Sequence, residues 1–292
     1  MSDDPFDAGF MHKLELLELV YRRIRGGQGA GESVGTGRGG RIEFREHRRY
    51  AAGDDFRYID WNVFGRSDSL FVKEYAREER RTVFVLLDAS ASMDFGRPGK
   101  LAYGKQIAAA FAWLALVAGD EAVVSTFADD FGRPIAVAGN KARIMEVLRD
   151  LRAIRARGRT DVAGSLKALQ SRFHRRGLVV LISDLMGADS RAALAGLAAR
   201  GFEPCVIHLL SREEAAPDQL GRLRLKDAET GDSRQLWIEG PELQEYTAVL
   251  NGFIDGWKTF CTAHGIAFVT ALTDIPFDEL VLGYLRQGGI VR

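Results

Sequence analysis

Short apolar runs alternate with segments of helical periodicity from about residue 81 onwards. The runs expected as strands are 82–87, 121–127, 178–182, 204–210 and 267–271, with 133–137 as a short edge strand. The segments expected as helices are 100–117, 141–152, 161–173, 190–200, 242–264 and 277–287. Continuous apolar strands that alternate with helices are typical of a mainly parallel sheet with both faces covered. The pattern therefore predicts a doubly wound α/β fold in which helices flank the sheet.

The first 80 residues follow a different pattern. Apolar residues at helical spacing predict an amphipathic helix over 11–25, and a glycine-rich stretch expected as a loop follows over 26–40. Short strands are expected at 41–46 and 69–74, on either side of a block dense in arginines, acids and aromatic residues. We interpret this block as a partly buried arginine–carboxylate network, because large aromatic residues tend to bury and then need polar partners.

The two patterns suggest a boundary near residue 80. Residues 1–80 are expected to form an N-terminal extension, which the arginine–carboxylate network clamps onto the main domain of residues 81–292. The extension is too small to hold itself together, so we expect it to pack against that domain. Within the main domain, a β-hairpin insertion is expected near 222–238.

Composition and charge narrow the class of protein. The apolar fraction of 46% is enough for a sizeable core, and the 40 basic and 40 acidic residues cancel. Bulk charge therefore gives no argument for nucleic acid or an anionic membrane. No basic segment precedes an apolar one at the N-terminus, and the longest apolar run, 107–118, is too short to span a bilayer. We expect a cytoplasmic protein without direct membrane insertion.

The first candidate functional residues lie at the end of the first core strand, where Asp88, Ser90 and Ser92 follow the apolar run. A carboxylate and two hydroxyls at this spacing can bind a hard divalent cation. The same residues can instead cap the following helix through side-chain hydrogen bonds to the backbone. These three residues alone leave both interpretations open.

Two more polar residues follow later strands. Thr160 stands just before a helix, and Asp184 ends the strand 178–182. Ligands of open parallel sheets bind beyond the carboxyl ends of the strands, where the strand order reverses. If the first and fourth core strands are neighbours, Asp88 and Asp184 face each other and Thr160 enters from the loop between them. This combination favours a metal site.

These residues resemble a known motif. The ordered set Asp88-x-Ser90-x-Ser92, Thr160 and Asp184 is similar to the metal-ion-dependent adhesion site of von Willebrand factor type A domains. The upstream block Arg49-Tyr50-x-x-Gly53-Asp54-Asp55-x-Arg57-x-Ile59-Asp60-Trp61, followed by Val72-Lys73-Glu74, resembles a bacterial signature. In the domain-of-unknown-function family number fifty-eight, that signature precedes a type A domain. The loop after Asp184 departs from the usual motif, because Leu185 and Met186 precede Gly187 where many type A domains have glycine directly after the aspartate.

The resemblance implies a metal-dependent protein-interaction module and no enzyme activity. The serines, Thr160 and the two aspartates would hold Mg²⁺, with Mn²⁺ or Ca²⁺ as alternatives, and a carboxylate from a protein partner would fill the open position. It further implies a MoxR-type AAA+ ATPase as partner, in the assembly or activation of other proteins. Arg155, Arg157 and Arg159 lead into Thr160, and we expect them to steer an acidic partner towards the metal.

Two other functions are compatible with parts of the sequence. A metal-dependent phosphoryl hydrolase would use Asp88 as nucleophile, but Ser90 stands where such enzymes generally need a second acid, and no lysine is obviously placed for the phosphate. A nucleic-acid-binding protein would use the basic run 149–159, which lacks interleaved aromatic residues. His208, in an apolar strand, is expected to be a core residue, and Asp161 a first-turn residue of its helix.

Overall fold

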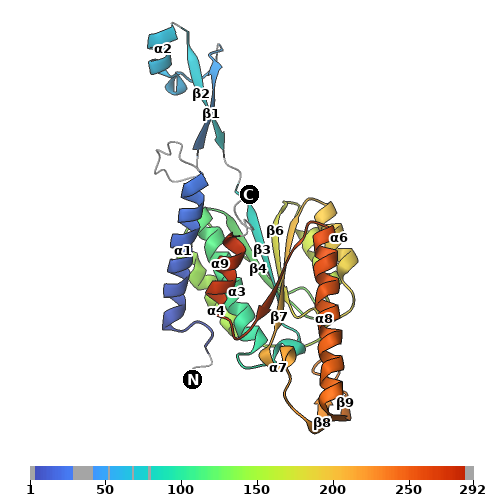
Figure 1. The fold of residues 1–292 in the computed structure, drawn as a ribbon. Coiled ribbons are helices and arrows are strands. Elements are labelled where there is room, and N and C mark those ends of the chain that lie inside the picture. The colour runs from blue at the N-terminus through green and yellow to red at the C-terminus, as the bar shows by residue number, and fades with distance from the viewer. Residues whose placement is uncertain (1–3, 29–41, 52, 68, 78–79, 287–292) are drawn as a thin grey trace. The chain divides into compact units, whose positions relative to one another are not determined.

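The computed structural model describes residues 4–28, 42–51, 53–67, 69–77 and 80–286 (Figure 1). The chain forms two compact units, one of Met1–Gln28 with Arg81–Arg292 and a smaller one of Gly29–Arg80. The larger unit contains the candidate site.

A six-stranded sheet forms the centre of the larger unit, in the order β10-β7-β6-β3-β4-β5. Neighbouring strands pair in parallel, except that the edge strand β5 runs antiparallel to β4. The strands are β3 (Thr82–Asp88), β4 (Glu121–Phe127), β5 (Ile135–Ala138), β6 (Gly177–Ser183), β7 (Glu203–Leu210) and β10 (Ala267–Leu272). The expected doubly wound sheet is confirmed, and its order reverses between β3 and β6, the first and fourth core strands.

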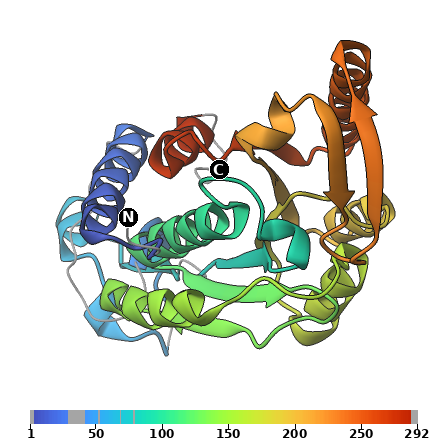
Figure 2. The same cartoon turned by 90° about the horizontal axis from the view of Figure 1, so that it is seen from below.

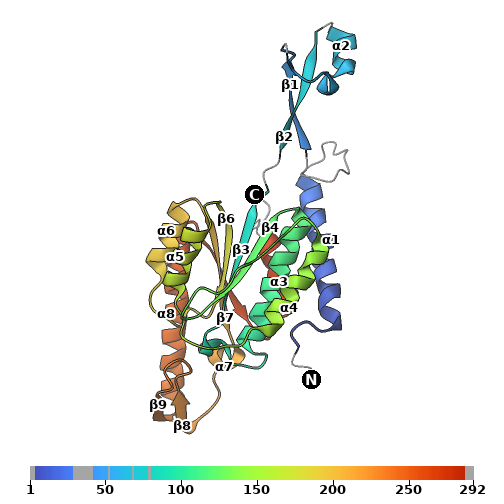
Figure 3. The same cartoon turned by 180° about the vertical axis from the view of Figure 1, so that it is seen from behind.

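Helices cover both faces of the sheet (Figures 2 and 3). The first face packs against α3 (Lys100–Ala118), α4 (Ile144–Ala153) and α9 (Phe277–Arg286), and α1 (Ala8–Gln28) packs on α3 and α9. The second packs against α5 (Val162–Arg172), α6 (Arg191–Ala199) and α8 (Gly240–Ala263). Alternate residues of β3 enter the two cores, Val85 and Leu87 on the first side and Phe84 and Leu86 on the second. This alternation explains why the strand is apolar throughout.

Helix α3 is the central helix of the first face. It is long and apolar enough to cross a membrane by length and composition alone, but most of that window is buried inside the unit. Gly104 lets the helix approach the sheet closely, because a Cβ there would lie 2.7 Å from Leu87 Cδ1. The small residues of α3 therefore allow the helix to pack closely against β3.

Helix α1 belongs to the larger unit, which differs from the boundary expected at residue 80. Phe10, Leu14 and Leu17 are buried in the first core, and the rings of Phe10 and Phe277 lie 5.0 Å apart. The amphipathic helix expected at 11–25 is confirmed, and its apolar face packs against α3 and α9. An amphipathic helix has to bury its apolar face against some partner, and spacing alone does not identify that partner.

The smaller unit pairs β1 (Ile42–Arg49) with β2 (Phe71–Arg77) in an antiparallel ladder, with the short helix α2 (Trp61–Ser67) between them. Among its described residues, Arg48 pairs with Asp54 at 2.9 Å and Arg57 with Asp55 at 2.6 Å. Tyr58 and Trp61 of this block have exposed fractions of 49% and 63%, and the expected clamp onto the main domain stays a prediction. Most of the loop expected over 26–40 lies outside the described residues.

The hairpin expected near 222–238 is confirmed as β8 (Gly221–Lys226) and β9 (Ser233–Ile238). It stands between the short helix α7 (Arg212–Ala215) and α8. Its two strands pair only with each other, as a two-stranded sheet separate from the six-stranded one. Contacts other than strand pairing therefore have to position the turn between the two strands, residues 227–232.

Candidate metal centre

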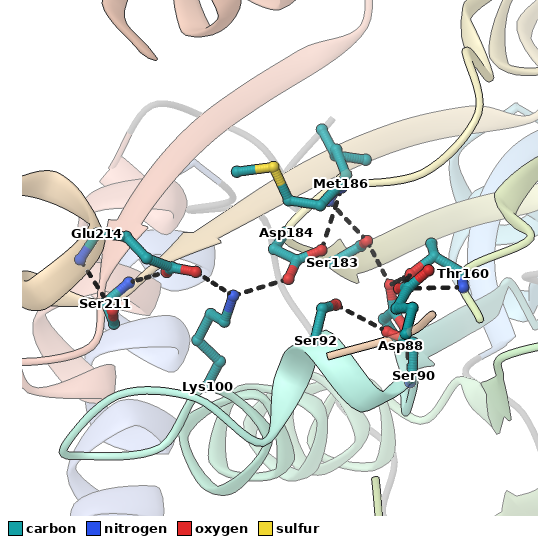
Figure 4. Close-up of polar contacts among 12 residues, drawn as sticks. Asp88, Ser90, Ser92, Lys100, Thr160, Ser183, Asp184, Met186, Ser211 and Glu214 are labelled. Atoms are coloured by element: carbon teal, nitrogen blue, oxygen red, sulfur yellow. Dashed lines mark hydrogen bonds and ion pairs between the residues drawn. The ribbon is translucent and has the colours of Figure 1, made fainter. Parts of the chain in front are cut away.

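Asp88 and Asp184 meet at the point where the strand order reverses (Figure 4). Asp88 is the last residue of β3 and Asp184 directly follows β6, the neighbouring parallel strand. Both side chains are completely buried. The structure thus brings the two acids together as the sequence predicted.

Hydrogen bonds fix the Asp88 carboxylate from two sides. The backbone N–H of Ser90 donates to Oδ1 at 2.9 Å, and the Ser183 hydroxyl donates to Oδ2 at 2.6 Å. Burial and the negative charge of Asp184 nevertheless raise the pKa of Asp88 to about 6. Two buried carboxylates side by side are unfavourable unless a cation compensates their charge.

Ser90 and Ser92 place two hydroxyls beside this carboxylate. Their Oγ atoms lie 3.0 Å apart, with Ser90 buried and Ser92 half-buried. The capping interpretation is wrong for the serines, because Ser90 makes no side-chain cap to the short turn that follows it. Helix α3 begins only at Lys100, after Gly99. The hydroxyls of both serines therefore remain candidates for binding a ligand.

Thr160 reaches the site because its loop is hydrogen-bonded to the loop after β3. The N–H of Ala91 donates to the Gly158 carbonyl at 3.0 Å, and the N–H of Arg157 donates to the Ala89 carbonyl at 2.8 Å. The Thr160 hydroxyl consequently lies 3.5 Å from Asp88 Oδ2. Asp161 points elsewhere, since its carboxylate caps α5 by accepting from the Gly164 N–H at 2.8 Å.

In the loop after β6, the backbone adopts a conformation typical of glycine although no glycine directly follows Asp184. Leu185 has a φ of 57°, and it is the one non-glycine residue with a positive φ in the described part of the chain. A side chain in this region costs about 1–3 kcal/mol, and such strain is typical of functional sites. Leu185 thus adopts a conformation for which glycine is the usual residue.

Lys100 is a member of the site that sequence reasoning missed. Its Nζ lies 2.7 Å from Asp184 Oδ2 and 2.6 Å from Glu214 Oε1, and the residue is 1% exposed. Burial opposes its charge, but Asp184 and Glu214 outweigh burial and raise the pKa of Lys100. Figure 4 shows the ammonium group between the two carboxylates. The only sequence signal is a lysine at the start of an otherwise apolar helix.

Ser183 was also missed, and it has a clearer sequence signal. It is the strand residue immediately before Asp184, and its hydroxyl links the two loops by donating to Asp88 and accepting from the Leu185 N–H at 2.9 Å.

His208, which pairs with Ser183 in the sheet register, is fully buried as expected. Burial lowers the pKa of His208 to about 4, so its ring is neutral at pH 7.

The donor set suits a hard divalent cation. The candidate ligands are hydroxyl and carboxylate oxygens, which Mg²⁺ prefers. In the described part of the chain, no three His, Cys, Asp or Glu side chains form a group that could hold a metal ion. A cation here would therefore depend on Ser90, Ser92 and Thr160 as well as on the two aspartates.

The three arginines before Thr160 lie at the surface. Arg155, Arg157 and Arg159 are all exposed, and the Arg155 guanidinium donates to the Arg152 carbonyl at 2.8 Å. They occupy the same loop as Thr160, which fits the expected steering of an acidic partner. That role stays a prediction.

Replacing Gly187 with alanine is expected to weaken cation binding without unfolding the protein. A Cβ at Gly187 would lie 2.9 Å from the Thr160 carbonyl oxygen and 3.1 Å from its Cβ, so the Thr160 loop must move. We expect the affinity for Mg²⁺ to fall on the order of tenfold, as for other changes behind a metal ligand. Calorimetric titration checks this, with Gly196→Ala as control, because a Cβ at Gly196 meets nothing within 4 Å. Equal affinities of the two variants would contradict this role of Gly187.

The chain matches a family model and several uncharacterized relatives. A family model described as "Protein of unknown function DUF58" matches residues 46–247. Uncharacterized proteins of Mycobacterium tuberculosis and Mycobacterium bovis are 28% identical over 249 residues, which cover 83% of this chain and 77% of each relative.

Two solved structures have more distant similarity. BatB of Bacteroides thetaiotaomicron is 13% identical, with a TM-score of 0.44 over 71% of this chain and 98% of BatB. The SpRpn10 VWA domain is 12% identical, with a TM-score of 0.40 over 69% of this chain and 94% of that domain.

Proposed function

The chain belongs to the DUF58 family of proteins of unknown function, and from this premise and the geometry of the site we propose that it is a divalent-metal-dependent protein-interaction module. The observation that supports it most is the buried pair Asp88 and Asp184, which the fold places beside the hydroxyls of Ser90, Ser92 and Thr160. This is the arrangement expected of a von Willebrand factor type A domain with an adhesion site.

In this proposal the five side chains Asp88, Ser90, Ser92, Thr160 and Asp184 hold Mg²⁺, directly or through water. The bound cation supplies a positive position that a carboxylate of a partner protein can occupy. Ser183 orients Asp88 through its 2.6 Å hydrogen bond. Lys100 compensates part of the charge of Asp184 and of Glu214, and the bound cation itself attracts an acidic group of the partner.

The proposed partner is an acidic segment of another protein. Arg155, Arg157 and Arg159 are exposed in the segment that leads into Thr160, and in this proposal they add to the attraction. The family resemblance makes a MoxR-type AAA+ ATPase the first candidate, with assembly or activation of other proteins as the process. We propose a cytoplasmic location on the same basis.

The surroundings of Lys100 argue against a phosphoryl hydrolase. A lysine that serves a transferred phosphate has to reach the substrate, but Lys100 is buried and both of its neighbours are carboxylates of this chain. Position 90, where such an enzyme generally needs a second acid, is occupied by serine. These observations favour binding over catalysis.

Capture of partners from the native cell tests the proposal. The tagged full chain is expected to retain a partner in Mg²⁺ and to lose it in EDTA, and mass spectrometry then checks for the ATPase. Ser90→Ala should lose the partner even in Mg²⁺, because it removes a ligand oxygen beside Asp88. Ser171→Ala is the matched control, since its hydroxyl bonds only the Ala168 carbonyl in the described contacts. Retention in EDTA, or by Ser90→Ala in Mg²⁺, that equals the retention by the wild type in Mg²⁺ would contradict the proposal.

A further inference from the structure

The hairpin β8–β9 brings a further carboxylate to the candidate metal centre. Glu229, in the turn between the two strands, accepts a hydrogen bond from the Thr160 hydroxyl at 2.7 Å. Its Oε1 atom also lies 3.3 Å from the Thr160 backbone N–H, which donates to it. Thr160 is one of the five proposed ligands, so the hairpin contacts the centre directly.

The turn is built to present this residue. The Asp227 carboxylate accepts from the N–H groups of Glu229 and Thr230, both at 2.8 Å, and the Asp227 N–H donates to the Asp232 carbonyl at 2.8 Å. Gly231 provides the positive φ of 79° that the turn requires. Glu229 is half-buried, whereas the other residues from 227 to 232 are exposed. The turn therefore directs one side chain inwards.

The Thr160 hydroxyl lies between two carboxylates. It is 2.7 Å from Glu229 Oε1 and 3.5 Å from Asp88 Oδ2, but a hydroxyl has only one proton to donate. The proton goes to the nearer acceptor, Glu229, and this leaves the oxygen lone pairs and the Asp88 carboxylate facing each other. A cation between them would remove the repulsion.

The buried acids leave room for a cation. Lys100 is shared between Asp184 and Glu214, so its one positive charge does not balance the negative charges of Asp88, Asp184 and Glu214. A divalent cation would compensate the remainder. Among the described residues, Glu229 is a carboxylate that contacts the proposed ligand Thr160 from outside the loops at the strand ends, so it can act on a cation by direct contact.

We propose that Glu229 is a carboxylate ligand of the metal centre, supplied by this chain to the position that a partner's carboxylate would otherwise fill. This inference rests on the proposed function. In the described part of the chain, Asp88, Asp184 and Glu229 do not form a group that could hold a metal ion in the structure as it stands. Cation binding therefore includes a movement of the Glu229 carboxylate away from Thr160, which its two methylene groups allow. A partner has to displace Glu229 in order to bind.

Counting the waters on bound Mn²⁺ tests this inference. Mn²⁺ replaces Mg²⁺ in the full chain, and water-proton relaxation gives the number of exchangeable waters. Glu229→Gln is expected to gain one water and to bind Mn²⁺ on the order of tenfold more weakly. The fold should persist, because glutamine still accepts the Thr160 hydrogen bond. Asp232→Asn is the matched control, since it removes one acid from the same turn and is expected to match the wild type.

The outcomes separate this inference from the proposed function. Equal water numbers in the wild type and Glu229→Gln, with Mn²⁺ bound to both, would overturn the role of Glu229 and leave the metal centre intact. A wild type that binds no Mn²⁺ at all would overturn the proposed function and this inference together. One more water in Glu229→Gln but not in Asp232→Asn supports both.

Discussion

Replacing Lys100 with methionine is expected to lower the free energy of unfolding by about 3–5 kcal/mol in EDTA. The substitution leaves Asp184 buried without a cation, beside Asp88, and it also removes the partner of Glu214. Removing one member of a buried ion pair costs this much because the remaining charge is neither solvated nor compensated. Urea denaturation at neutral pH measures the change.

Addition of Mg²⁺ should restore part of the stability that Lys100→Met loses, because the cation then compensates Asp184. Lys167→Met is the control, since Lys167 is exposed on α5 and surface changes of this kind usually stay within about 0.5 kcal/mol. Stabilities of the two variants that agree within this margin would show that Lys100 does not balance the buried acids.

Replacing Asp88 with asparagine is expected to have two opposite effects. In EDTA the variant should be more stable than the wild type at neutral pH, on the order of 1–3 kcal/mol, because the pKa of Asp88 is raised to about 6 and its charge is unfavourable. In Mg²⁺ the order should reverse. The wild type gains about 4.1 kcal/mol at a thousandfold excess over the dissociation constant, and the variant gains nothing.

The pH dependence of Asp88→Asn gives an independent check. A carboxyl whose pKa is higher in the folded than in the unfolded state binds its proton more tightly when folded. The stability of the wild type in EDTA should therefore rise as the pH falls from about 6 to about 4, and this contribution should be missing in the variant. Asp161→Asn is the control, because asparagine also caps a helix and Asp161 is not among the proposed ligands. Mg²⁺-dependent stabilisation that survives in Asp88→Asn would contradict the assignment of this ligand.

Much of the fold was predictable because its signals are local. A strand buried on both faces has to be apolar throughout, and β3, β6 and β7 are recognisable for that reason. Polar residues at the ends of such strands stand out, so Asp88 and Asp184 could be placed at one edge of the sheet. Thr160 could be expected beside Asp88 because its loop lies in the chain between the first and fourth core strands, which are neighbours in the sheet.

The rest depends on contacts between distant segments. Nothing in the spacing of α1 shows that Phe10 packs on Phe277 near the other end of the chain. Lys100 becomes the partner of both Asp184 and Glu214 only when the first turn of α3 meets the loop after β6 and helix α7. Glu229 stands in a turn that reads as an ordinary hairpin connection, and only the tertiary fold brings it to Thr160.

The central claim is that these oxygens bind a divalent cation, and calorimetric titration of the EDTA-treated and dialysed full chain with Mg²⁺ tests it most directly. The expected result is saturation at one Mg²⁺ per chain in the wild type and no saturable binding in Asp88→Asn. An isotherm without saturable binding in the wild type, or equal binding by Asp88→Asn, would contradict the claim.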